Sequence, residues 1–361
     1  MINSVGIHNF KLFKDVQQEF KPLTLLTGLN GRGKSTILQA LLTAWYSLKE
    51  GSDYLILDNE YVKVGTAEEI LPWYLDDRKV SLSLSVDGKS YILSSTEVKN
   101  EEASDDIVHL VDDGSRELVF LPHLHYLSAD RMPKSDIFST ASQAVKKRTL
   151  SGRYGDGMAT ARFLYEYGHE GLEVPELGFK GCTSQTLMGQ ANAWLKIISP
   201  DLNFHVNRLG NQYQIRYTSV NMPGMPLSSN AINVGFGITY ALPMITAILS
   251  SSPGDVVIVE TPEAHIHPAG QARLMDLCAL AAANGIQVIL ETHSDHIING
   301  LLRNVKQNVI SSDEVMVLFF DKEEGAEFPE IFNMPVASTG RILSPRKNFF
   351  DQYRSDLRAL L

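Results

Sequence analysis

The sequence predicts an α/β fold built around a buried parallel β-sheet. Short apolar segments, each ending at polar or glycine residues, occur at 23–26, 124–127, 256–259 and 287–290. Such runs are typical of strands buried on both faces. A longer segment with helical spacing of apolar residues separates the last two, at 270–283. Strands alternating with helices favour a parallel sheet with crossover helices.

A phosphate-binding loop connects the first buried strand to the helix that follows it. Residues 28–36 fit the pattern G-x-x-x-x-G-K-[ST] at every defined position. The glycines let backbone N–H groups point at phosphate oxygens, Lys34 reaches the β- and γ-phosphates, and Ser35 holds Mg²⁺. The expected ligand is a nucleoside triphosphate, bound by Gly28, Asn30, Gly31, Arg32, Gly33, Lys34, Ser35 and Thr36.

The N-terminal part of the chain, residues 1–131, is expected to be rich in β-structure. Residues 79–97 alternate apolar and polar side chains around Asp87-Gly88, which predicts a β-hairpin. Residues 98–116 are acidic and polar, so we expect a mobile loop or a solvated edge there.

Residues 132–200 follow as a mainly helical insertion, and residues 201–361 complete a single domain. A second hairpin is expected around Gly210. The insertion carries a basic cluster made of Lys134, Lys146, Lys147, Arg148 and Arg153. These side chains either contact a nucleic-acid backbone or form a solvated helix face.

Composition excludes several classes of protein. The formal net charge of −10 argues against a surface that binds nucleic acid indiscriminately. Cys182 and Cys278 lack C-x-x-C spacing, which favours structural thiols in a reducing compartment. No apolar run approaches the length needed to cross a bilayer. We therefore expect a soluble, cytoplasmic protein with no membrane partner.

Polar residues follow the buried strands at 256–259 and 287–290. The carboxyl ends of parallel strands are where such a sheet binds its ligands. Glu260 follows the strand at 256–259 and can reach the Mg²⁺ held by Ser35. His293 follows the strand at 287–290 and can sense or polarise the γ-phosphate. The same region offers a rival, a transition-metal hydrolase, because six of its residues are common metal ligands: Glu263, His265, His267, His293, Asp295 and His296. That rival leaves the phosphate-binding loop unexplained.

A second helix N-terminus opened by glycines occurs at Asn233-Val234-Gly235-Phe236-Gly237. Its N–H groups could bind another phosphate, although this chain already has one loop for that purpose. The alternative is a loop with two glycines before a core helix.

Taken in order, the segments 28–36, 233–237, 260–268 and 291–294 resemble the ABC-type ATPase heads of the SMC, RecF and OLD group. The similarity extends almost end to end and is closest to stand-alone OLD-like bacterial ATPases. Stretches similar to theirs occur at 126–131, 190–195 and 340–352.

The resemblance implies a P-loop ATPase head that dimerises around two ATP molecules, as a homodimer or a higher even-numbered assembly. Each ATP is then bound by one copy's P-loop and by Gly235 and Gly237 of the other copy. Glu260 takes the Mg²⁺-binding Walker B position and His293 the switch-histidine position. The loop at 265–268 crosses the interface.

Three departures from the family pattern shape the functional prediction. Thr261 stands where the family has its general-base glutamate, and Gly235 replaces the signature serine. Glu263 is the candidate base, and because a well-placed base contributes about 10²–10⁴-fold in rate, hydrolysis could be slow. The residues after His293 do not suggest a nuclease domain, so cutting would need a separate protein.

The predicted function is therefore an ATPase head that regulates a separate effector, such as a nuclease or toxin, in bacterial anti-phage defence. The alternative is a RecF- or SMC-like DNA repair or DNA-clamp ATPase, with Lys146, Lys147 and Arg148 on the DNA-binding face. A transporter subunit is disfavoured because the interval from Lys34 to Glu260 is too long.

Overall fold

The computed structural model of the 361-residue chain describes residues 1–72, 77–99, 102, 104–111, 119–131, 142–219, 229–230, 235–347, 349–350 and 360. Among them no helix is long and apolar enough to cross a membrane.

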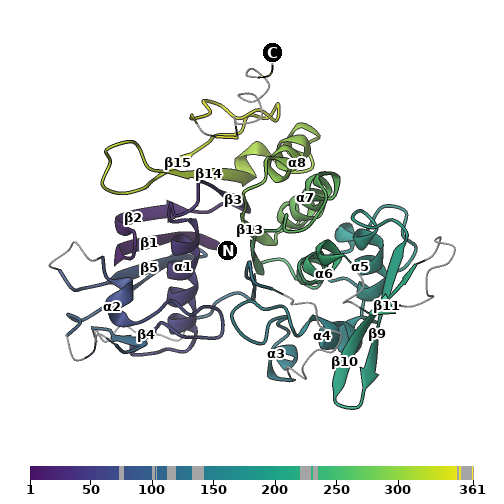
Figure 1. Cartoon of the computed structure of the whole chain (residues 1–361), viewed down its shortest axis with the longest axis horizontal. Helices are drawn as coiled ribbons and strands as arrows, with labels where there is room; N and C mark the ends of the chain where they lie inside the picture. The colour runs from purple at the N-terminus through teal and green to yellow at the C-terminus, as the bar shows by residue number, and fades with distance from the viewer. Residues whose placement is uncertain are drawn as a thin grey trace.

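A six-stranded sheet forms the centre of the molecule (Figure 1). Its order is β15-β14-β3-β13-β12-β8, and all neighbours are parallel except the edge strand β15. The strands are β3 (Leu23–Gly28), β8 (Leu124–Leu127), β12 (Val256–Glu260), β13 (Gln287–Glu291), β14 (Val315–Asp321) and β15 (Glu330–Asn333). The four strands predicted from apolar runs are thus confirmed and lie in one sheet.

The alternation of side chains along each strand divides the core in two. Leu25, Val257 and Val288 belong to the core that also contains the helices α6 (Phe236–Leu249) and α7 (Pro268–Ala283). Leu26 and Ile258, one residue along, belong to the core that contains helix α1 (Lys34–Lys49). Helices cover both faces, which explains why these strands are apolar throughout rather than alternating.

An N-terminal lobe packs around α1. Its antiparallel sheet has the order β2-β1-β5-β6, from β1 (Ile2–Phe10), β2 (Phe13–Glu19), β5 (Ser81–Val86) and β6 (Lys89–Ser94). The predicted hairpin turn is confirmed, since Asp87 and Gly88 both have positive φ, as a type I′ turn requires. The lobe also contains the short helix α2 (Ala67–Ile70).

The acidic segment 98–116 is not entirely a loop. Within it, β7 (Ile107–His109) pairs with β4 (Tyr54–Ile56), and Val108 is buried. Val98 and Leu110 of the same segment are also buried. These few apolar residues lie among many polar ones, so the composition of the segment did not predict the strand.

A second lobe lies on the opposite side of the sheet, on the right of Figure 1. Its helices are short: α3 (Ser142–Lys146), α4 (Thr160–Tyr167), the 3₁₀ helix η2 (Pro175–Leu177) and α5 (Leu187–Leu195). The expectation of a mainly helical insertion is therefore met only in part over 142–199, because turns and loops separate these helices. The hairpin expected around Gly210 is confirmed as β9 (Leu202–Leu209) and β10 (Gln212–Ser219), with β11 (Ser229–Asn230) beside β10.

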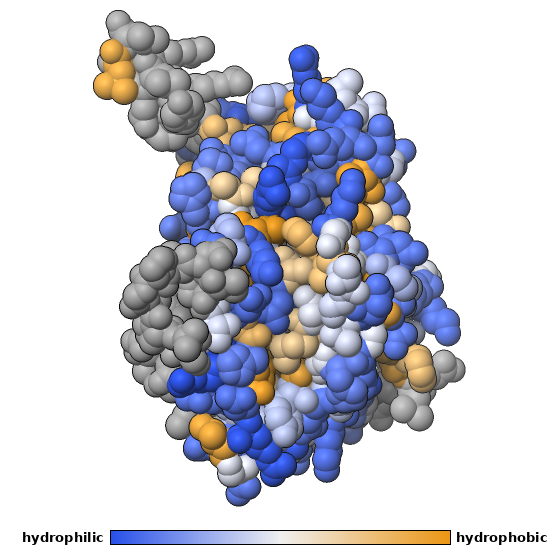
Figure 2. Space-filling view, turned by 90° about the vertical axis from the view of Figure 1, so that its right-hand side faces the viewer, coloured by the Kyte–Doolittle hydropathy of each residue, from blue (hydrophilic) through white to orange (hydrophobic). Residues whose placement is uncertain are grey.

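Helix α7 connects β12 to its parallel neighbour β13, as predicted for a crossover. Helix α8 (Asp295–Lys306) then packs against α7, and the 3₁₀ helix η4 (Ser312–Glu314) leads into β14. Figure 2 shows the face of the molecule that lies on the right in Figure 1. Hydrophilic residues cover most of this face, and apolar residues are exposed mainly across its middle.

Candidate nucleotide-binding site

A pocket of about 720 Å³ opens at the carboxyl ends of β3, β13 and β12, where an open α/β sheet binds its ligands. It is lined by the P-loop residues Asn30, Gly31, Gly33, Lys34, Ser35 and Thr36, by the strand-end residues Ala129, Glu260, Thr261, Glu291 and His293, and by Lys11, Leu12, Gln39, Glu69, Leu71 and Pro72. The sheet thus collects the predicted phosphate, metal and histidine positions at one edge.

Lys34 supports the curved backbone of the P-loop from within. Its Nζ donates to the carbonyl oxygens of Gly28 and Leu29, at 3.0 and 2.9 Å. Burial lowers the pKa of this ammonium, and the nearby Glu291 carboxylate partly opposes that shift. A buried cation held by neutral carbonyls has a strong electrostatic preference for an incoming phosphate.

Two glycines of the loop are required by close packing. Gly28 has φ +134°, and a Cβ there would lie 2.2 Å from the Phe320 carbonyl oxygen on β14. Gly33 has φ +97°, and its Cβ would lie 2.5 Å from the Phe13 ring. Both positions combine a left-handed backbone with contact to another element, so larger residues cannot be accommodated without shifting that element.

The start of α1 is open to an anion. Gly33 occupies the N-cap and supplies no side chain to cap the helix N–H groups. These groups and the helix dipole therefore remain available to phosphate. Arg32, which the sequence placed among the nucleotide ligands, has a buried Nε without a hydrogen-bond partner among the described residues.

Two carboxylates from neighbouring strands meet beside Ser35. Glu260 and Glu291 are paired across β12 and β13, and the Ser35 hydroxyl lies 3.1 Å from both Glu291 oxygens. Burial and the nearby Glu260 raise the pKa of Glu291 to about 7. Sequence reasoning predicted Ser35 and Glu260 as metal ligands but assigned no role to Glu291. Its position at the end of a buried strand was the available signal.

Glu260 is oriented by one group on β8 and one group just after it. The Tyr126 hydroxyl donates to one of its oxygens at 2.9 Å, and the Ala129 N–H lies 3.3 Å from the other. Burial and the adjacent Glu260 raise the pKa of Tyr126 well above its usual value, so its hydroxyl remains a donor. Ala129, two residues after β8, also lines the pocket.

The donor set fits Mg²⁺, a hard cation that prefers oxygen ligands. The Ser35 hydroxyl and the carboxylates of Glu260 and Glu291 supply oxygens only. The transition-metal rival finds no support, because the described residues contain no group of three or more His, Cys, Asp or Glu side chains that could hold a metal ion.

Glu263, the predicted general base, does not line the pocket. Its two oxygens accept from the Thr292 hydroxyl at 2.8 Å and from the His293 N–H at 2.7 Å. In this conformation Glu263 supports the segment that carries His293. The His293 ring is exposed to the pocket, and burial and Lys34 lower its pKa, so it is neutral at neutral pH.

The other end of the pocket was not predicted from the sequence. Lys11 lies in the turn between β1 and β2 with φ +52°, and its Nζ donates to Gln39 Oε1 on α1 at 2.8 Å. Leu12 from the same turn and Leu71 after α2 add apolar surface. This end can receive the base of a nucleotide, whose flat face is largely apolar. Only the tertiary structure brings the turn and α2 together.

The two signature glycines have different surroundings. Gly235 is the exposed N-cap of α6, and a Cβ added there would have no neighbouring atom within 4 Å, whereas a Cβ at Gly237 would lie 2.4 Å from the His265 carbonyl oxygen. Neither lines the pocket of the same chain. Asn233 and Val234 of the predicted segment lie outside the described residues.

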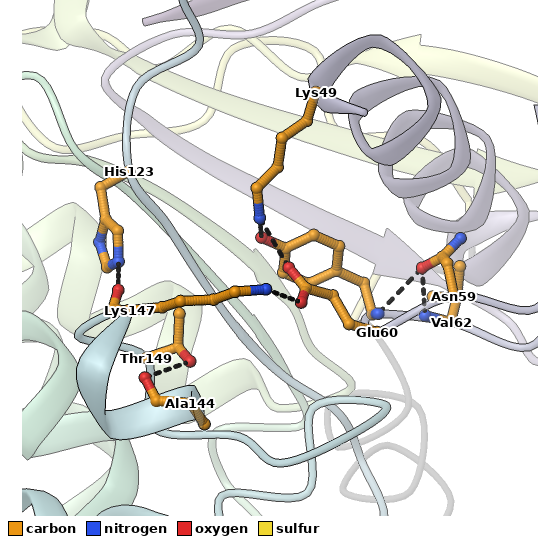
Figure 3. A network of polar contacts seen from close by, with 9 residues as sticks. Lys49, Asn59, Glu60, Val62, His123, Ala144, Lys147 and Thr149 are labelled. Carbon is orange, nitrogen blue, oxygen red and sulfur yellow. Dashed lines mark hydrogen bonds and ion pairs between the residues drawn. The ribbon is translucent and has the colours of Figure 1, made fainter. Parts of the chain in front are cut away.

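The basic cluster is largely paired with acidic residues. Lys147 shares Glu60 with Lys49, at 3.1 and 2.6 Å (Figure 3). Arg148 pairs with Glu170 at 3.1 Å, and Arg153 pairs with Asp58 at 2.7 Å. Lys146 is exposed, and Lys134 lies outside the described residues. The Lys147 and Arg153 pairs connect the two lobes, whereas the Arg148 pair lies within the second lobe. All three offset positive charge that DNA binding would require.

Comparisons with known proteins point to ATPases. A family model described as an AAA ATPase domain matches residues 1–118, which include the P-loop. A second model, described as an AAA domain with the AbiEii toxin of a type IV toxin–antitoxin system named alongside, matches residues 212–299. The chain is an ATPase. The ATPase class predicted from the sequence is therefore confirmed.

One curated relative is the DNA double-strand break repair Rad50 ATPase of Archaeoglobus fulgidus, which is 33% identical over 95 residues. That match covers 26% of this ATPase and 9% of the relative's length.

Two solved structures share the fold. The SMC head bound to the C-terminal winged-helix domain of ScpA has a TM-score of 0.52 at 13% identity, and covers 92% of this ATPase and 97% of that chain. The Pyrococcus furiosus SMC head with an extended coiled coil, bound to the C-terminal domain of ScpA, has a TM-score of 0.52 at 10% identity and covers 100% and 99%. The predicted head-type fold is confirmed. The closer similarity to the OLD-like branch stays a prediction.

Proposed function

We propose that this ATPase binds Mg-ATP, that two copies enclose two ATP molecules, and that the ATP-bound dimer controls a separate effector protein in bacterial defence against phage. The observation that carries the proposal is the division of the phosphate-binding groups. The P-loop, Glu260 and Glu291 line one pocket, while the open N-terminus of α6 at Gly235 lies outside it. A second copy would be needed to bring that helix to the nucleotide.

Each residue of the pocket has a separate task in this proposal. The P-loop N–H groups and Lys34 bind the phosphates, and Ser35, Glu260 and Glu291 would hold Mg²⁺. When bound, Mg²⁺ would supply positive charge that offsets the negative charge of the phosphates. His293, neutral at neutral pH, can hydrogen-bond to the γ-phosphate.

Slow hydrolysis follows from the position of the candidate base. Thr261 lines the pocket but cannot accept a proton from water, and Glu263 is engaged by Thr292 and His293. Glu263 would have to leave these donors to act as the base. The ATP-bound dimer would then persist long enough to act as a signal.

The defence setting is supported by the toxin–antitoxin system named with the second family model. The Rad50 relative, named for DNA double-strand break repair, favours a second candidate, an ATPase that acts directly on DNA. Against it, Lys147, Arg148 and Arg153 already have acidic partners. DNA binding that weakens steeply with salt and is lost when Lys146, Lys147 and Arg148 become Ala would support this second candidate.

The dimer is tested by placing a negative charge at Gly235. This residue is exposed and has ordinary backbone dihedrals, so Gly235→Glu should fold normally, yet its carboxylate would face the partner's phosphates. Gly171→Glu, at another exposed glycine with no atom closer than 3.8 Å, is the matched control. Molar mass would be measured by light scattering with ATP, with ADP and without nucleotide.

Wild-type protein and Gly171→Glu should double in mass with ATP alone, and Gly235→Glu should stay monomeric while still binding ATP. A wild-type mass that does not change with ATP would disprove the sandwich.

A further inference from the structure

Arg131 is a buried arginine that joins three segments of the head. Its exposed fraction is 0%. One terminal nitrogen donates to the carbonyl oxygens of Ser128 and Glu260, at 2.8 and 2.5 Å, and the other donates to that of Thr261 at 3.0 Å. Nε donates to the carbonyl oxygen of Tyr240 at 3.2 Å. The guanidinium therefore connects the end of β8, the end of β12 and helix α6.

These bonds are to the backbone, which fixes positions rather than pairing charges. No described carboxylate forms an ion pair with Arg131, and burial lowers the pKa of its guanidinium to about 10. Taking an arginine out of water is costly unless its donors are satisfied. The four carbonyl contacts satisfy four of the five N–H donors of the guanidinium, so the positions of the three segments depend on one another.

The segment after β12 is held in an unfavourable conformation. Thr261 has φ +43°, although β-branched residues rarely adopt positive φ. Its N–H donates to the Glu291 carbonyl oxygen at 2.8 Å, and its own carbonyl accepts from Arg131. Glu291 and Arg131 thus impose this conformation beside the phosphate end of the pocket.

Helix α6 contacts the same segment at two further points. The Tyr240 ring packs edge-on against the His265 ring, with centroids 5.0 Å apart, and the Arg131 guanidinium lies 5.3 Å from the Tyr240 centroid. The backbone of Gly237 lies directly against the His265 carbonyl. A displacement of the segment that follows Glu260 would therefore displace the first two turns of α6.

We propose that Arg131 is a positioning residue that transmits occupancy of the phosphate pocket to helix α6. Binding of Mg-ATP acts on Glu260 and Thr261, whose carbonyls hold the guanidinium, and the guanidinium in turn holds the Tyr240 carbonyl. Within one chain this links the pocket to the N-terminus of α6. The effect of this link on a second copy rests on the proposed dimer, in which the N-terminus of α6 contacts the nucleotide of the partner.

Hydrogen–deuterium exchange of the α6 amides tests the link without requiring a dimer. Wild-type protein would be kept dilute enough to be monomeric, and exchange at 236–249 compared with and without Mg²⁺ and a non-hydrolysable ATP analogue. We expect the analogue to slow exchange in α6 by about tenfold in wild type, a typical size for coupling between sites. Arg131→Lys, with one nitrogen in place of three, should lose most of this slowing while its affinity for the analogue stays within about twofold.

Two further variants keep the test decisive. Arg303→Lys is the control, because Arg303 also donates to a backbone carbonyl, that of Ala272, but joins α7 to α8. It should retain the wild-type slowing. If Arg131→Lys does not fold, Tyr240→Ala removes the ring that packs on both Arg131 and His265 and should reduce the slowing.

Slowing that persists in Arg131→Lys, or in Tyr240→Ala if that variant has to replace it, or slowing that is absent from wild type, would overturn the proposal. A wild-type protein that shows the slowing but does not dimerise with ATP would leave the link intact and disprove the proposed dimer instead.

Discussion

Replacing Glu291 with Gln should change how the stability of the nucleotide-free protein depends on pH. The Glu291 side chain is only 6% exposed, and its pKa is raised from 4.5 to about 7 by burial and by Glu260. The folded protein therefore binds this proton more tightly than the unfolded chain does. The stability contributed by the protonated carboxyl is fully present below pH 4.5 and is lost as the pH rises through about 7.

The size of the effect follows from the shift. A pKa that moves from 4.5 to about 7 corresponds to roughly 3 kcal/mol, at about 1.4 kcal/mol per pH unit. Gln keeps an oxygen that accepts from Ser35 but carries no charge. It also loses the attraction to Lys34, which reduces the gain. We expect Glu291→Gln to exceed wild type by about 1–3 kcal/mol at pH 8 and to show little gain at pH 4.5.

Urea unfolding followed by circular dichroism at both pH values, with a chelator present, measures the difference. The exposed Glu324→Gln is the control and should match wild type at both pH values. Added Mg²⁺ at pH 8 should stabilise wild type and have a smaller effect on Glu291→Gln, because the cation stabilises the charged carboxylate. A gain of equal size at both pH values would refute the reasoning, since it could not come from the ionisation of Glu291.

Three further predictions concern the nucleotide site. Lys34→Met should abolish binding of a fluorescent ATP analogue yet leave the protein folded, because methionine fills the same space without the charge. Gly28→Ala should lower the free energy of unfolding in urea by about 1–3 kcal/mol, since the new Cβ meets the Phe320 carbonyl; an unchanged midpoint would contradict the close packing. Glu263→Gln should lower steady-state phosphate release by about 10²-fold or more if this residue is the base. Unchanged turnover in the purified dimer would remove Glu263 from the chemistry and direct attention to Glu291.

Several parts of the site were predictable because the necessary information is local. The P-loop combines glycines with positive φ, a lysine and a serine within nine consecutive residues. Each strand that borders it is predicted by an apolar run in the sequence. Glu260 follows such a run directly, and His293 follows one after two intervening residues. Their placement at one sheet edge follows from the parallel arrangement of the strands, which the crossover helix α7 made predictable.

Other parts depended on which strands became neighbours. The order β3-β13-β12 places Glu291 next to Ser35, although many residues separate them in the chain. Glu263 was the better candidate from sequence, yet the turn after β12 directs its oxygens to Thr292 and His293. Strand order is decided by packing between segments that are distant in the chain. The pattern of apolar residues within one segment therefore does not predict it.

The sequence by itself determined that this protein is a P-loop ATPase, because phosphate recognition is built from consecutive backbone groups. The tertiary structure decided how that loop is completed and connected. It placed Glu291 beside Ser35, brought Lys11 to the far end of the pocket, and buried Arg131 among carbonyls of β12 and α6. These contacts join residues that are far apart in the chain, and only the folding of both lobes against one sheet brings them within hydrogen-bond distance.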